Sequence, residues 1–202
     1  MTRIAAHSVL ARIETLFMTH GQRACNDSGV PHKSVTALQH ALQCAQLAEW
    51  AHADDTLVAA ALLHDIGHFM PTDDRTDPDL RHEERALPWL MSVFPLSVTE
   101  PIRLHVAAKR YLASVDPRYA ERLTPAAVYD LAVQGGAMDA EEVRRFDALP
   151  YGPDAVQLRL WDDLAKHPGK VTPPLGRYLR LLQRLLTERT ASKPSPSVIG
   201  TL

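Results

Sequence analysis

The chain has 202 residues, of which 46% are hydrophobic and 23% are charged, and its formal net charge is −2 at pH 7. This length can bury a substantial core, the composition is that of a globular protein, and the near-neutral charge argues against a nucleic-acid or membrane partner. Two cysteines, Cys25 and Cys44, without a CxxC motif support neither a disulfide framework nor a zinc ribbon, whereas ten histidines are unusual.

The N-terminus lacks the apolar core of a signal peptide, and no stretch of about 18 apolar residues is present. We therefore expect a cytoplasmic protein.

The first helix is predicted over residues 8–20, where apolar side chains recur at helical spacing and Gly21 supplies a stop. Residues 26–33 are polar and contain glycine and proline, which indicates a loop. A second helix should follow Ser34 as its N-cap and carry His40 just off its apolar stripe. Taken alone, His40 is more often a core histidine than a metal ligand.

The third helix contains the apolar run 57–63, which is too short to cross a membrane, and it ends at His64 and Asp65. Adjacent helical residues point about 100° apart, so these two side chains could flank a metal ion only near a helix end. Asp65 could then bridge two ions through its two oxygens. The simpler alternative is a helix C-terminus that carries a histidine and a solvated carboxylate.

A polar loop is predicted over residues 71–78, and a fourth helix should begin near Asp79 and carry His82. Pro88 is expected to kink that segment, because proline lacks the N–H that a helix interior needs.

The next helix is signalled by the capping-box spacing of residues 97–100, with Pro101 in its first turn. This helix carries His105 and, one turn later, Lys109.

Start and stop signals predict four further helical segments, over residues 124–136, from residue 139 through Phe146, over residues 154–166 with Arg159 and Asp162, and over residues 175–185. Residues 192–202, with two prolines and three serines, are expected to be a disordered tail. No alternating strand pattern is present, so the predicted fold class is all-α, with a single domain over residues 1–191.

Six candidate metal ligands come from five different helices, and all are imidazoles or carboxylates: His40, His64, Asp65, His82, His105 and Asp162. Such donors suit iron, manganese or zinc, and a helical bundle can direct one or two side chains from each helix at a common centre. One ion needs only four of these ligands. The surplus predicts a second ion, bridged to the first by Asp65.

Three further side chains share helix faces with these ligands: Lys109 follows His105 by four residues, Arg159 precedes Asp162 by three, and His68 follows His64 by four. If the ligands face the metals, both cations face the same cavity, which would suit an oxyanion such as a phosphate or phosphonate. The alternative is that Lys109 and Arg159 lie on a solvated surface.

The order of His40, His64-Asp65 and Asp162 resembles the HD-domain superfamily, which is α-helical and mostly comprises metal-dependent phosphohydrolases. A more extensive resemblance, to the PhnZ-type diiron oxygenases that cleave 1-hydroxyphosphonates, runs through residues 41–45, 63–68, 104–112, 134–136, 154–159 and 161–163.

This resemblance implies an HD-domain helical bundle with a mixed-valence Fe²⁺/Fe³⁺ pair that uses O₂ to cleave the C–P bond of a small organophosphonate. The products would be inorganic phosphate and a carboxylic acid. By matching position, one iron would take His40, His64, Asp65 and Asp162, and the other Asp65, His82 and His105. Lys109 and Arg159 would bind the phosphonate, with His68 beside the substrate, and His68 and Lys109 are the candidate catalytic side chains.

One segment departs from the aminophosphonate-specific members, which carry a tyrosine and a glutamate before the first ligand helix. Residues 30–33 here are Val-Pro-His-Lys, and a lysine cannot accept a hydrogen bond from an ammonium group. A smaller or uncharged substrate, such as hydroxymethylphosphonate, is therefore expected.

Two other functions use the same sequence features. A phosphomonoesterase or nucleotidase would use the same ligands to direct a bridging hydroxide at phosphorus. A non-catalytic helical protein would keep the metal only as a structural element, although six ligands exceed what that role needs.

Overall fold

The computed structural model describes residues 3–24, 35–70 and 81–191, and within these ranges it is built of helices. They are α1 (Arg3–His20), α2 (Ala37–Trp50), α3 (Asp55–Leu63), the 3₁₀ helix η2 (Ile66–Phe69), α4 (His82–Arg85), α5 (Leu87–Val93), α6 (Leu96–Val115), α7 (Pro117–Glu121), α8 (Pro125–Val133), α9 (Ala140–Asp147), α10 (Gly152–Leu164) and α11 (Leu175–Ala191). No strand occurs in the described ranges, where a lone antiparallel bridge joins Ala24 to Thr36. The all-α fold class is confirmed.

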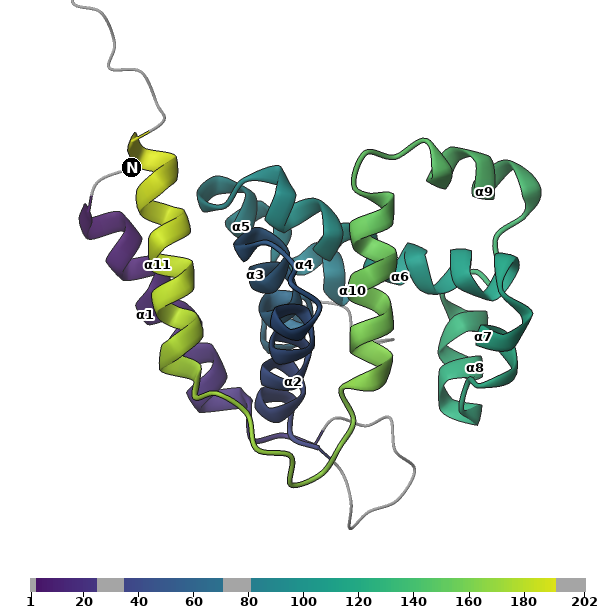
Figure 1. Ribbon diagram of the computed structural model, residues 1–202, viewed down its shortest axis with the longest axis horizontal. Coiled ribbons are helices and arrows are strands. Elements are labelled where there is room, and N and C mark those ends of the chain that lie inside the picture. The colour runs from purple at the N-terminus through teal and green to yellow at the C-terminus, as the bar shows by residue number, and fades with distance from the viewer. Residues whose placement is uncertain (1–2, 25–34, 71–80, 192–202) are drawn as a thin grey trace, which may run out of the picture.

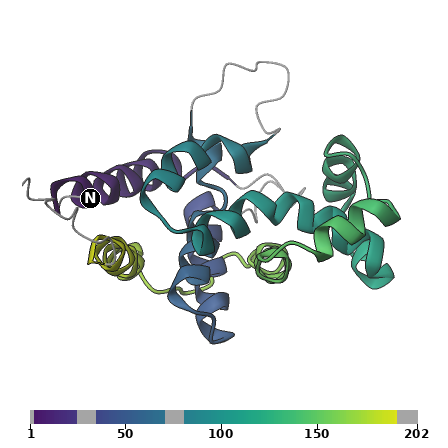
Figure 2. The ribbon, with the colours of Figure 1, turned by 90° about the horizontal axis from the view of Figure 1, so that it is seen from above.

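The centre of the molecule is α3, whose residues 57–63 are all buried. Asp54 caps this helix by accepting from the backbone N–H groups of Thr56 and Leu57, both at 2.9 Å. A helix that is apolar on all sides must be surrounded by other elements. Figures 1 and 2 show α3 and α2 in the middle, α1 and α11 at one end, and α7, α8 and α9 at the other end beyond α6 and α10.

Two apolar clusters fill this arrangement. The larger surrounds α3 and takes side chains from α1, α2, α5, α10, α11 and the start of α6. The smaller joins α6, α9 and α10 through Leu104, Ala108, Phe146 and Ala155. Because α6 and α10 contribute to both clusters, they lie between the central helices and the α7–α9 end, and each carries polar side chains into the interior.

Several helix boundaries follow from the predicted caps. Thr124 caps α8 by accepting from Ala127 N at 3.1 Å, and Asp139 forms a capping box with Glu142 at the start of α9. The predicted kink at Pro88 is a break, because α4 ends at Arg85 and Pro88 lies in the first turn of α5.

Other boundary predictions were wrong. The N-cap of α2 is Thr36, in a capping box with Gln39, and not Ser34, which lies outside the described residues. The predicted capping box at 97–100 does not form: α6 begins at Leu96 after Pro95, and the Glu100 carboxylate binds Arg103 instead.

The helix ends also differ from the predictions at other places. Helix α1 begins five residues before residue 8, at Arg3, and α10 spans 152–164 in place of 154–166. Helix α7 was missed, although Asp116 followed by Pro117 is an N-cap and first-turn proline of the kind that located α8. The predicted loops at 26–33 and 71–78, the start near Asp79 and the tail at 192–202 lie outside the described residues.

Candidate metal centre

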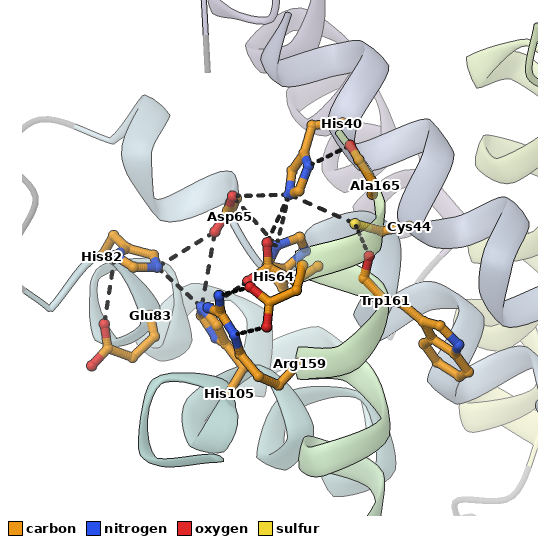
Figure 3. Close-up of polar contacts among 12 residues, drawn as sticks. His40, Cys44, His64, Asp65, His82, Glu83, His105, Arg159, Trp161 and Ala165 are labelled. Carbon is orange, nitrogen blue, oxygen red and sulfur yellow. Dashed lines mark hydrogen bonds and ion pairs between the residues drawn. The ribbon is translucent and has the colours of Figure 1, made fainter. Parts of the chain in front are cut away.

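The six side chains predicted as metal ligands come together between α2, α3, α4, α6 and α10, and we call them the donor cluster: His40, His64, Asp65, His82, His105 and Asp162 (Figure 3). The four imidazoles and Asp162 are buried, with residue exposures between 0% and 8%. Buried polar groups of this kind need partners. Here, the partners are largely one another.

Asp65 lies at the middle of the donor cluster and divides its two oxygens between two pairs of histidines. Its Oδ2 is 3.6 Å from Nε2 of His40 and 3.3 Å from Nε2 of His64, which we call the first histidine pair. Its Oδ1 is 3.4 Å from Nε2 of His82 and 3.9 Å from Nε2 of His105, the second histidine pair. This division is the geometry that a carboxylate bridging two ions requires.

Asp65 can occupy this position because α3 ends before it. His64 is the C-terminal cap of α3, and Asp65 has φ −97° and ψ 5°, outside the α-helical region. The side chains of His64 and Asp65 therefore diverge less than they would inside a helix. The predicted position of the pair at a helix end is confirmed.

Within each pair, the imidazole Nε2 atoms face one another, 3.3 Å apart in the first pair and 3.1 Å apart in the second. Asp162 Oδ1 lies 3.2 Å from Nε2 of His40. Two ligand atoms about 2.1 Å from one ion and at right angles to each other are about 3.0 Å apart. The spacing of these donors therefore fits an ion between them.

Backbone carbonyls fix the protonation of three of the rings. His40 Nδ1 lies 3.1 Å from Ala165 O, and His64 Nδ1 lies 3.0 Å from Ala61 O. His105 Nδ1 lies 2.7 Å from Ile102 O. Because a carbonyl oxygen only accepts, each Nδ1 carries a hydrogen, and each Nε2 points into the donor cluster, where it can bind either a proton or a cation. Burial would lower the pKa of both rings of the first pair, but Cys44 and Asp162 raise the pKa of His40 and Asp65 and Asp162 raise the pKa of His64, each well above its ordinary value. A proton therefore lies between the two facing Nε2 atoms until a cation replaces it.

The charges around the donor cluster also favour a cation. Burial by itself would raise the pKa of the Asp65 carboxyl, but the neighbouring His64 and His82 hold it well below its ordinary value. Burial would likewise raise the pKa of Asp162, and Arg159 and His40 hold it well below. Both carboxyl groups are therefore ionised. Burial followed by the charges of His82 and His64 lowers the pKa of His105 to about 3, so its ring is neutral, as a metal ligand must be.

The two predicted cations are buried, so the solvated-surface alternative was wrong. Lys109 is 3% exposed and Arg159 is 7% exposed. Burial, and next the charge of Arg159, lower the pKa of Lys109. No hydrogen bond or ion pair to Lys109 is found within the parts of the chain that the structure describes. Arg159, by contrast, contacts Asp162 and Asp163.

His68 lies at the more open side of the donor cluster. Its side chain is 31% exposed, and its Nε2 is 3.9 Å from Asp65 Oδ1. The ring stacks on that of His82, with the centroids 4.0 Å apart. Gly67 makes this packing possible, because a Cβ at that position would lie 1.9 Å from the carbonyl oxygen of His82.

Sequence reasoning gave no role at this centre to two side chains on α2. Gln43, predicted only as part of a helix, binds the backbone of His167 through both its amide nitrogen and its amide oxygen, at 2.9 and 3.1 Å. Cys44, interpreted as a small core residue, is buried with its Sγ 3.6 Å from His40 Nε2. Their spacing of three and four residues after His40 was the available signal.

Comparison with known proteins identifies the family of this chain. A family model for the HD domain matches residues 37–110, which include five of the six donors. The hydroxymethylphosphonate dioxygenase of Gimesia maris is 42% identical over 176 residues, which cover 83% of this chain and 84% of that protein. The chain belongs to the family of HD-domain phosphonate dioxygenases.

Two other proteins are similar to this chain over most of its length. The family includes the glycine-betaine-forming [1-hydroxy-2-(trimethylamino)ethyl]phosphonate dioxygenase of Leisingera caerulea, which is 39% identical over 75% of this chain and 80% of its own length. An uncharacterized protein of Acanthamoeba polyphaga mimivirus is 33% identical over 78% of this chain and 75% of its own length. Within the described residues, no helix is both long enough and apolar enough to cross a membrane.

Proposed function

We propose that this protein is an iron-dependent oxygenase that cleaves the C–P bond of a small 1-hydroxyphosphonate. For hydroxymethylphosphonate, one O₂ would be consumed, and formate, inorganic phosphate and one proton would form. The observation that carries the proposal is the division of the Asp65 carboxylate between two histidine pairs, beside a buried lysine. The similarity to the Gimesia maris enzyme supports the substrate class.

The donor set fits two borderline ions. The first histidine pair, Asp65 and Asp162 would hold one ion, and Asp65 with the second histidine pair would hold the other. Nitrogen and oxygen donors without thiolate suit iron in its two common oxidation states. The chemistry that a bound iron pair supplies is one-electron activation of O₂ and Lewis acidity toward the substrate oxygens.

Lys109 would bind the phosphonate group. A buried ammonium without a protein partner is costly, and a phosphonate oxygen would offset its charge. Because burial lowers the pKa of Lys109, an anionic substrate would raise that pKa again and keep the side chain protonated. Arg159 would support the same anion through N–H groups that Asp162 and Asp163 do not use.

His68 would contact the substrate from the open side. Its ring lies beside the donor cluster without the deep burial of the other imidazoles. A partly exposed imidazole can hold or pass a proton near neutral pH, which suits a reaction that releases one proton. The expected preference for a substrate without an amine rests on residues 30–33, which lie outside the described residues. The cytoplasmic location stays a prediction.

The decisive experiment measures phosphate release from hydroxymethylphosphonate by protein loaded with iron, with and without O₂. We expect one phosphate and one formate for each O₂ consumed, and no release without O₂. Lys109→Met should raise KM strongly while the iron content stays unchanged. Release of phosphate from a phosphate monoester under anaerobic conditions, with no reaction of the phosphonate, would overturn the oxygenase and favour a phosphohydrolase.

A further inference from the structure

The guanidinium of Arg159 is held along one edge by a neighbouring carboxylate on its own helix. Its Nε donates to Asp163 Oδ2 at 3.0 Å, and its Nη2 donates to Asp163 Oδ1. The remaining terminal nitrogen, Nη1, contacts Asp162 Oδ2 at 2.7 Å. Asp163 therefore binds the guanidinium through two hydrogen bonds, whereas Asp162 contacts it through the single nitrogen Nη1.

Tyr119 closes this network from a different helix. It lies on α7, is 4% exposed, and donates from its hydroxyl to Asp163 Oδ2 at 2.8 Å. The same hydroxyl oxygen accepts from Arg159 Nε at 3.2 Å. Burial, with a further contribution from Asp163, raises the pKa of Tyr119, so the phenol stays protonated and keeps donating. A short helix outside the central core thus sets the position of Asp163.

This arrangement determines how Asp162 meets the donor cluster. Arginine and carboxylate prefer to bind through two parallel hydrogen bonds. If Asp163 did not occupy the Nε–Nη2 edge, Arg159 could turn that edge toward Asp162 and engage both of its oxygens. In the structure it engages Oδ2 alone, and Oδ1 faces His40 at 3.2 Å.

We propose that Tyr119 and Asp163 are positioning residues for the metal centre: they hold Arg159 so that Asp162 keeps Oδ1 directed at the first histidine pair. The inference rests on the proposed metal site but not on the proposed reaction. The inference also gives Arg159 two roles: it would face the substrate, and it orients Asp162. Partners behind a ligand commonly tune metal affinity in this way.

The test compares metal affinity in three single variants by anaerobic iron(II) titration, with electron paramagnetic resonance of the oxidised samples. Tyr119→Phe keeps the ring and removes the hydroxyl, and we expect about three- to tenfold weaker binding of the tighter ion. Asp163→Asn removes the charge that competes with Asp162 for Arg159, and we expect about ten- to a hundredfold weaker binding. Asp163→Glu restores the carboxylate and should recover part of the affinity.

Tyr111→Phe is the matched control. Its hydroxyl also donates to a carboxylate, Asp147 Oδ1, at 2.8 Å, but that pair joins α6 to α9 away from the donor cluster. It should leave the iron affinity and the resonance signal at wild-type values. Thermal melts of the metal-free proteins show whether Tyr119→Phe and Tyr111→Phe fold alike.

Wild-type affinity and an unchanged signal in both Tyr119→Phe and Asp163→Asn would overturn the positioning role. If Asp163→Asn does not fold, the result for Tyr119→Phe decides alone. A wild-type protein that binds two ions without O₂-dependent phosphate release would refute the proposed reaction and leave this inference standing. A wild-type protein that binds no metal would refute both.

Discussion

The two histidine pairs differ in the helices that carry them. His40 lies on α2 and His64 at the end of α3, whereas His82 of the second pair lies on the one-turn helix α4. His40 and His64 are 1% and 0% exposed, and backbone carbonyls of residues 165 and 61 orient their rings. His82 begins α4, which has four residues, and its Nδ1 is 3.8 Å from the carboxylate of Glu83, within ion-pair distance. His105 on α6 resembles the first pair, with Nδ1 2.7 Å from Ile102 O.

This difference separates a histidine pair that is part of the hydrophobic core from one that depends on local packing. Removing a donor from the first pair should disturb folding and metal binding together. Removing His82 should disturb metal binding far more than folding, because few core contacts depend on a one-turn helix.

The largest expected effect comes from comparing His40→Ala with His82→Ala. In the metal-free protein, His40→Ala leaves a cavity and an unpaired carbonyl at Ala165, and we expect a loss of about 2–4 kcal/mol of unfolding free energy. His82→Ala should cost about 1 kcal/mol or less. Each variant should hold one iron in place of two. Urea unfolding and iron analysis measure both quantities.

His7→Ala, an exposed histidine on α1, serves as the control and should match the wild type in both measurements. Equal losses of unfolding free energy in the His40 and His82 variants would show that both histidine pairs are equally integrated into the hydrophobic core.

The next prediction tests the packing around the second histidine pair without removing a donor. In Gly67→Ala, the new Cβ would lie 1.9 Å from the carbonyl oxygen of His82, so α4 must shift. We expect a loss of about 1–3 kcal/mol in unfolding free energy, and iron lost from the second pair alone. Metal analysis with urea unfolding checks this.

Gly176→Ala on α11 is the matched control, because the nearest atom to its added Cβ is the end of a flexible arginine at 3.9 Å. That variant should keep both ions and the wild-type stability or slightly more. Retention of two ions by Gly67→Ala would mean that α4 tolerates displacement.

The smallest expected effect concerns the hydrogen bonds that hold His40 of the first histidine pair in place. Gln43 binds the backbone of His167 twice, and this holds the segment whose Ala165 carbonyl orients His40. Gln43→Met keeps the volume and removes both hydrogen bonds. We expect about 1–2 kcal/mol lower unfolding free energy and about three- to tenfold weaker binding of the ion at the first pair.

Gln46→Met one turn later is the control for this change. Its Oε1 is buried, and it lacks a hydrogen-bond partner in the portion of the chain that the structure describes. The substitution removes an unsatisfied amide oxygen and should be neutral or stabilising. Equal affinity losses in both variants would indicate a general effect of repacking α2.

Helix identity was largely readable from local signals, because caps and apolar spacing act over a few residues. Thr124 and Asp139 cap their helices as predicted. The capping-box motif at 97–100 failed because α6 begins at Leu96, so Ser97 lies inside the helix, and Glu100 binds Arg103 one turn away. The sequence also indicated all six donors by residue type and spacing, and the structure brings them together.

What the sequence alone determined is the list of candidate metal ligands, the all-α class and the helix-end position of His64 and Asp65, since each depends on residue type and local spacing. Only the tertiary structure decided which oxygen of Asp65 faces which histidine pair, and that Arg159 is held by Asp163 and Tyr119. Residues 119 and 159 are forty positions apart and on different helices. Helical periodicity carries no information at that separation, so their contact exists only once α7 and α10 are packed.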